Sequence, residues 1–161
     1  MMNKFLLDTN VLIHKIRESH IWAHIESVHF KKGVNNNGFI SQVTVGELLA
    51  FAYENKWGSN RRKKLKETIG LFERLAIDDN KTLKAYARIS AYSRNRHKSL
   101  KLPKHFPAKD MGKNDIWIAA TAVAIEAPLI STDKDFEHLD GVFLDFIYID
   151  QDKISNPAAH V

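Results

Sequence analysis

The sequence has 161 residues, a length that predicts one domain with one hydrophobic core, expected over residues 1–150 and followed by a tail at residues 151–161. The absence of cysteine excludes disulfides and thiolate metal sites and favours a reducing, cytoplasmic compartment. The net charge is +5. The longest apolar run after the N-terminal segment, residues 116–125, is too short for a membrane span, which needs about 20 residues.

The first element is an apolar run over residues 5–13 that three polar residues interrupt: Asp8, Thr9 and Asn10. This pattern predicts a buried parallel strand whose carboxyl end places Asp8 at the edge where α/β sheets bind ligands. Thr9 or Asn10 can cap a short helix after the strand, and Ser19 can cap a second helix.

A second strand is predicted at residues 39–40, and a helix follows it from Ser41 or Thr44. Glu47 lies within this helix and shares one face with Val43 and Phe51, each one turn away. An acid in the middle of an apolar stripe has no capping role. Glu47 therefore needs another explanation.

The middle of the chain is basic. Residues 1–109 contain 21 Lys and Arg against 9 Asp and Glu, whereas residues 110–161 contain 3 against 10. We predict basic helices over residues 61–75 and 81–95, and then a long exposed loop over residues 97–112. The positive charge suits a polyanion, because each neutralised phosphate releases counterions. A solvated helix face and a mobile loop explain it equally well.

The remaining chain continues the alternation of helix and strand. We predict a helix opened by Asn114 and Asp115, a strand at residues 129–131, a short helix after it, and a last strand at residues 142–149. Together with the earlier elements, this order predicts a three-layer α/β fold in which helices flank a mostly parallel central sheet of about five strands.

Four acids occupy corresponding positions, at strand ends or in the first turns of helices: Asp8, Glu47, Asp115 and Asp133. In a parallel sheet these positions converge on one edge. Clustered carboxylates repel one another unless a cation holds them, and all-oxygen ligands favour Mg²⁺ or Mn²⁺. Each Asp alone is better explained as a helix cap or turn residue, so the hypothesis depends on all four meeting.

Four segments resemble the PIN domain family, metal-dependent ribonucleases that include the toxins of VapBC toxin–antitoxin pairs. They are LLDTNVLI at residues 6–13, ISQVTVGELLAF at 40–51, NDIWIAATAVAIEAPLISTDKDF at 114–136 and LDFIYI at 144–149. The resemblance implies a PIN-like fold and a Mg²⁺ or Mn²⁺ site formed by Asp8, Glu47, Asp115 and Asp133. It implies supporting roles for Asn10, Thr132 and Asp135.

The resemblance also implies an activity and partners. We expect an endoribonuclease that hydrolyses RNA, a toxin role with a cognate antitoxin, and a homodimer. The basic segment between residues 94 and 109 is longer than compact toxins need, and we expect it to clamp RNA through Arg94, Arg96, Lys98, Lys101, Lys104 and Lys109. The alternative is a catalytically silent RNA-binding PIN module.

A second metal site is a weaker hypothesis. His20 and His24 lie four residues apart on a predicted helix and could share a zinc ion. No adjacent Glu or third ligand is evident, so we interpret them as ordinary, partly exposed side chains. The sequence also has no Gly-rich phosphate loop and no GxSxG motif.

Overall fold

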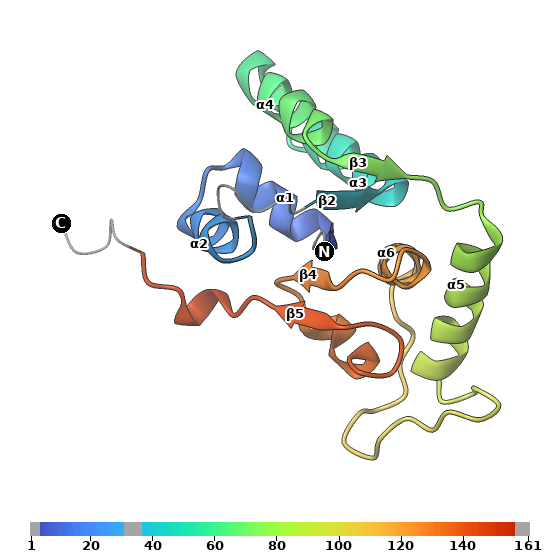
Figure 1. Cartoon of the computed structure of the whole chain (residues 1–161). Coiled ribbons are helices and arrows are strands. Elements are labelled where there is room, and N and C mark those ends of the chain that lie inside the picture. The colour runs from blue at the N-terminus through green and yellow to red at the C-terminus, as the bar shows by residue number, and fades with distance from the viewer. Residues whose placement is uncertain (1–3, 31–36, 157–161) are drawn as a thin grey trace.

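The computed structural model describes residues 4–30 and 37–156. Five strands form one sheet in the order β3-β2-β1-β4-β5, and every neighbouring pair is parallel (Figure 1). The strands are β1 (Lys4–Leu7), β2 (Asn37–Ser41), β3 (Glu73–Leu75), β4 (Leu129–Ser131) and β5 (Phe146–Tyr148). The predicted parallel sheet of about five strands is confirmed.

Helices connect the strands. They are α1 (Thr9–Ile16), α2 (His20–His29), α3 (Gln42–Glu54), α4 (Ser59–Gly70), α5 (Asn80–Ser93) and α6 (Lys113–Ala124), with short 3-10 helices η1 (Lys134–Leu139) and η2 (Gln151–Lys153). No helix in the described ranges is long and apolar enough to cross a bilayer.

The two faces of the sheet carry separate cores. Along β1, Phe5 and Leu7 join a core built with α1 to α4, whereas Leu6 faces a second core built with α5, α6 and η1. Alternating side chains of a strand point to opposite faces, so β1 is buried on both. This arrangement confirms the three-layer prediction.

One predicted element was wrong. The sequence predicted a single helix over residues 61–75, but α4 ends at Gly70 and the chain then forms the edge strand β3. Phe72 packs against β2 where Gly38 has no side chain, since a Cβ there would lie 2.6 Å from the Phe72 ring. A strand of three residues is too short to show its own period, so the apolar positions continued the helical pattern.

Other predicted boundaries also shifted. Asp8 caps α1 instead of Thr9 or Asn10. The last strand covers only Phe146–Tyr148, because residues 140–144 form a turn closed by a bridge between Asp140 and Leu144. Within the predicted tail, residues 151–153 form η2, and residues 157–161 lie outside the described part of the chain.

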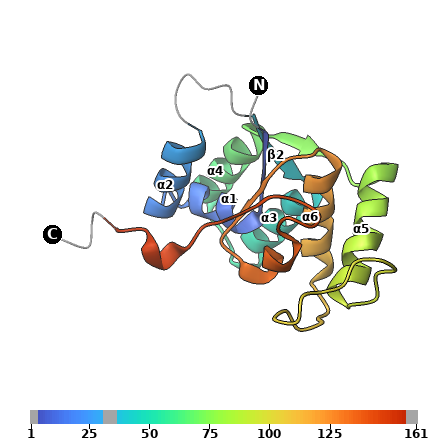
Figure 2. The ribbon, with the colours of Figure 1, turned by 60° about the horizontal axis from the view of Figure 1, so that its bottom comes forward.

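The predicted long loop is confirmed and covers residues 94–112. Figure 2 shows it as the yellow segment that joins the lower ends of α5 and α6. Leu100, Leu102 and Met111 pack against the core beneath α5 and α6. These contacts anchor the loop, which leads the chain to the start of α6 and to Asp115.

Candidate active site

Asp8 is held at the carboxyl end of β1 and is only 3% exposed. One carboxylate oxygen accepts a hydrogen bond from the backbone N–H of Thr9 at 2.7 Å, as expected for a helix cap. The other accepts one from the hydroxyl of Ser131 at the end of β4, at 2.6 Å. These contacts fix the carboxylate between the ends of two neighbouring strands.

Glu47 lies on the second turn of α3, where two other helices approach it. The hydroxyl of Thr9 donates to Oε2 of Glu47, and the side-chain amide of Asn114 donates to Oε1 at 2.9 Å. Thr9 begins α1, and Asn114 lies in the first turn of α6. The carboxylate is thereby joined to both helix starts.

Asp115 is the third residue of α6, and its carboxylate bends back over the residue before the helix. A Cβ at Gly112 would lie 2.8 Å from Oδ2 of Asp115. That distance is shorter than carbon–oxygen contacts allow, so Gly112 is the residue that leaves room for this carboxylate.

The acids also influence one another electrostatically. Burial is the largest cause that raises the pKa of Asp8 to about 7; the hydrogen bonds from Ser131 and Thr9 oppose it, and the charges of Asp115 and Glu47 make smaller contributions in the raising direction. Burial, followed by the negative charges of Asp133, Glu47 and Asp135, raises the pKa of Asp115 to about 6. Mutual repulsion of this kind is what a bound cation would relieve.

Asp133 and Asp135 lie at the start of η1, near enough to Asp115 to raise its pKa. Asp133 accepts a hydrogen bond from the backbone N–H of Asp135, and its own N–H donates to the Ser131 hydroxyl, both at 2.9 Å. Lys109 pairs with Asp135 at 3.0 Å. Ser131 thus joins Asp8 to Asp133, and Lys109 joins this turn to the basic loop.

Two adjoining cavities contain all but one of the predicted acids and supporting residues. Asp8, Glu47 and Asp115 line a cavity of about 340 Å³, together with Thr9 and Asn10. A neighbouring cavity of about 570 Å³ is lined by Thr132 and Asp133 and shares Asn10 with the first, whereas Asp135 lines neither. Three of the four acids therefore face one space, and the fourth lies on the next.

The donor set fits a hydrated hard cation. Among the described residues, no three His, Asp or Glu side chains stand close enough to hold one ion by themselves. Mg²⁺ typically keeps several waters and takes only one or two carboxylates directly, so this spacing suits an ion bound partly through water. His20 and His24 likewise find no third ligand within the described chain.

Sequence reasoning missed four residues of the site. Thr9, Ser131 and Asn114 hold the acids through hydrogen bonds, and Glu54 lines the first cavity. Each of the three donors is next to an acid in the sequence or at the end of a strand. That position is the sequence signal that could have identified them. The expected hydroxyl, Thr132, lies in the second cavity instead.

The predicted RNA-binding residues divide into two groups. Arg94 forms an ion pair with Asp110, and Lys109 pairs with Asp135. The others are exposed and form no ion pair with any described residue: Arg96, Lys98, Lys101 and Lys104. Four cations of the loop are therefore available to a polyanion.

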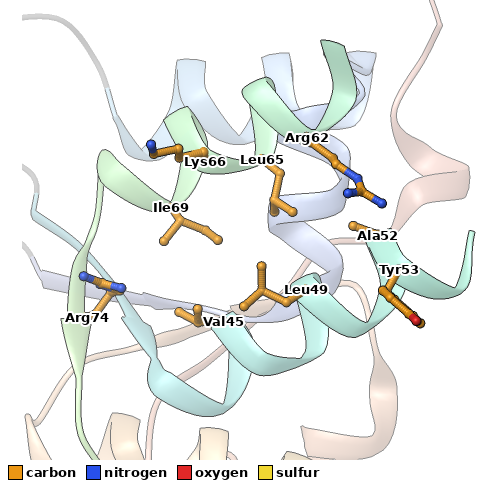
Figure 3. A pocket seen from close by; sticks show the side chains of 9 residues that line it. All are labelled: Val45, Leu49, Ala52, Tyr53, Arg62, Leu65, Lys66, Ile69 and Arg74. Atoms are coloured by element: carbon orange, nitrogen blue, oxygen red, sulfur yellow. The ribbon is translucent and has the colours of Figure 1, made fainter. Parts of the chain in front are cut away.

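A separate apolar groove of about 510 Å³ lies between α3 and α4 (Figure 3). Val45, Leu49, Leu65 and Ile69 line it, and cationic side chains including Lys66 stand at its rim. None of the four acids lines this groove. It is a binding surface candidate distinct from the acid cavities.

Comparisons with known proteins identify the family. The PIN domain model matches residues 5–142, whereas no curated protein matches significantly. VapBC2 from Rickettsia felis, solved bound to a DNA fragment from their promoter, is 21% identical, with a TM-score of 0.65 over 89% of this chain and 98% of that one. VapBC-1 from nontypeable Haemophilus influenzae is 21% identical, with a TM-score of 0.63 over 90% and 97%. FitAcB from Neisseria gonorrhoeae is 23% identical, with a TM-score of 0.62 over 89% and 96%.

Proposed function

The chain belongs to the PIN domain family, and from that premise we propose that it is a metal-dependent endoribonuclease hydrolysing RNA phosphodiester bonds. The observation that carries the proposal is the convergence of Asp8, Glu47 and Asp115 on one cavity, where the pKa values of both Asp residues are raised to about 7 and about 6. A purely structural set of helix caps would not place repelling carboxylates together.

Asp8, Glu47, Asp115 and Asp133 hold Mg²⁺ or Mn²⁺ in this proposal, directly or through water. When bound, such an ion stabilises the charge of the phosphate and lowers the pKa of water. The chain's own part is orientation: Ser131 holds Asp8, and Thr9 with Asn114 holds Glu47. Asn10, Thr132 and Asp135 are the supporting polar groups.

In this proposal the basic loop binds the RNA. Arg96, Lys98, Lys101 and Lys104 attract the RNA backbone, while Arg94 pairs with Asp110 within the loop and Lys109 holds the loop to Asp135. The loop leads directly into α6, so phosphate bound along it is delivered close to Asp115. Acids in the cavity would repel phosphate unless a cation inverts the local charge, which is consistent with metal dependence.

The biological role we infer is that of a toxin with a cognate antitoxin. Support comes from solved structures of the same fold, which include a member of the VapBC family of toxin–antitoxin systems from Mycobacterium tuberculosis and a toxin–antitoxin complex from Klebsiella pneumoniae. The groove between α3 and α4 supplies a surface for an antitoxin segment, because exposed Leu49 and Tyr53 lie beside Arg62 and Lys66. That chemistry fits an amphipathic helix with acidic flanks.

The test of the partner is co-expression with the product of the neighbouring gene, followed by purification of the complex. The proposal predicts a stable complex that Leu49→Asp disrupts, whereas Leu83→Asp, at an exposed position of α5, leaves it intact. A complex unaffected by Leu49→Asp contradicts the groove assignment. Light scattering of the purified chain tests the expected homodimer, and a monomer at all concentrations contradicts it.

The test of the enzyme is cleavage of single-stranded RNA by protein stripped of antitoxin and of metal with EDTA. Restored cleavage on addition of Mn²⁺ is the expected result, and metal-independent cleavage contradicts the mechanism. Binding of RNA without cleavage under all conditions supports the rival function, a silent RNA-binding PIN module.

A further inference from the structure

The second cavity beside the acids has a composition of its own. It is lined by residues along α1, by α3, by the turn after β4 and by the start of η2, and it shares Asn10, Ile13 and Phe51 with the acid cavity. Its volume of about 570 Å³ is large enough for a nucleotide-sized group. The two cavities are therefore continuous parts of one groove.

Two cations line this second cavity. Arg17 and Lys134 are exposed, and neither forms an ion pair with any residue the structure describes. The guanidinium carbon of Arg17 lies 5.9 Å from the centre of the Phe51 ring. The ammonium of Lys134 lies 5.3 Å from the Tyr148 ring. Aromatic faces thus position both cations without neutralising them.

The other titratable groups in the cavity leave it positive. His14 is half-buried, and burial lowers its pKa, so it is neutral near pH 7. Asp133 is the one carboxylate lining this cavity, at its boundary with the acid cluster. A cation held by the acid cluster would offset the charge of Asp133 and would leave the two positive charges of Arg17 and Lys134 uncompensated.

We propose that this second cavity is a phosphate subsite, in which Arg17 and Lys134 bind the RNA backbone next to the bond to be cleaved. The inference rests on the proposed nuclease function and deepens it, because it adds a phosphate contact formed by residues outside the basic loop. Lys109 ties that loop to Asp135, the residue next to Lys134.

The first experiment measures binding of a labelled single-stranded RNA to the non-cleaving Asp115→Asn protein at several salt concentrations. Arg17→Gln with Lys134→Gln weakens binding, and the slope of log K against log salt falls by about 0.7 for each lost phosphate contact, about 1.4 for the pair. The control, Lys81→Gln with Lys84→Gln, removes the same charge from exposed positions at the far end of α5.

A slope for the Arg17 and Lys134 variant equal to that of the control overturns the inference, and each single variant repeats the comparison if the double variant is unstable. Cleavage by the otherwise unmodified chain separates this result from the proposed function. Wild-type cleavage combined with unchanged binding in the variant leaves the nuclease standing and removes the subsite. Absence of wild-type cleavage removes the nuclease, while the binding slopes still decide the subsite.

Discussion

Asp8→Asn, measured in EDTA, isolates the free energy of burying an ionised carboxylate at the end of β1. Burial raises the pKa of Asp8 from 3.8 to about 7 in the folded chain. Between these pH values the folded state keeps a proton that the unfolded state releases, so stability falls as pH rises and levels off above about pH 7.

The magnitude follows from that shift. Each pKa unit corresponds to about 1.4 kcal/mol, so the ionised carboxylate destabilises the metal-free protein by about 4 kcal/mol near pH 8. Asn caps a helix as well as Asp does, and loss of the Ser131 hydrogen bond costs about 1 kcal/mol. Asp8→Asn should therefore stabilise the chain by about 3 kcal/mol, or raise Tm by roughly 6 to 12 °C.

The assay is thermal unfolding by circular dichroism across the pH range. The advantage of Asp8→Asn should shrink to almost nothing near pH 5, where the ionisation cost is only about 1.5 kcal/mol. Asp79→Asn is the matched control, because Asp79 also caps a helix but hydrogen bonds with Thr82 lower its pKa. Its substitution should not stabilise the chain at any pH. A lower Tm for Asp8→Asn near pH 8 would refute the reasoning.

Three further predictions concern the site. Gly112→Ala would place a Cβ 2.8 Å from the Asp115 carboxylate. The carboxylate should therefore be displaced, and cleavage should slow by about 10- to 100-fold with little change in Tm. In the control, Gly70→Ala, the added Cβ meets nothing within 4 Å, so the cleavage rate should not change. Asn114→Ala removes a donor to Glu47 and should reduce the rate by about tenfold in the same assay, and an unchanged rate would show that this contact does not orient the acid. The pKa of Asp115 is raised to about 6, so protons should compete with the metal ion for this carboxylate. The cleavage rate should therefore fall as pH drops through about 6, and a rate that rises there would contradict the prediction.

The fold could be predicted largely because its signals are strong. β1 is a buried apolar run followed by polar residues, and α6 is built from small residues, of which Ala119 and Ala120 are fully buried. Strand β3 could not be predicted, because three residues at a sheet edge carry no period of their own. The packing of Phe72 over Gly38 is a tertiary contact that only the folded chain shows.

The site was predictable in its acids and less so in the groups that hold them. Glu47 stood out because a mid-helix acid beside Phe51 has no local role. Ser131 and Thr132 are adjacent hydroxyl residues, and which one faces Asp8 depends on the phase of a three-residue strand. Arg17 and Lys134 line the same cavity, although one follows α1 and the other lies in the turn after β4. No sequence pattern connects those two segments.

The most direct test of the central claim is the Mn²⁺ dependence of RNA cleavage in Asp115→Asn beside Asp110→Asn. Both changes remove one carboxylate near the start of α6, but Asp110 pairs with Arg94 on the exposed loop and lines neither acid cavity. The account predicts that Asp115→Asn abolishes cleavage at every Mn²⁺ concentration while Asp110→Asn cleaves like wild type. Equal cleavage by the two variants, or cleavage by either in EDTA, would contradict it.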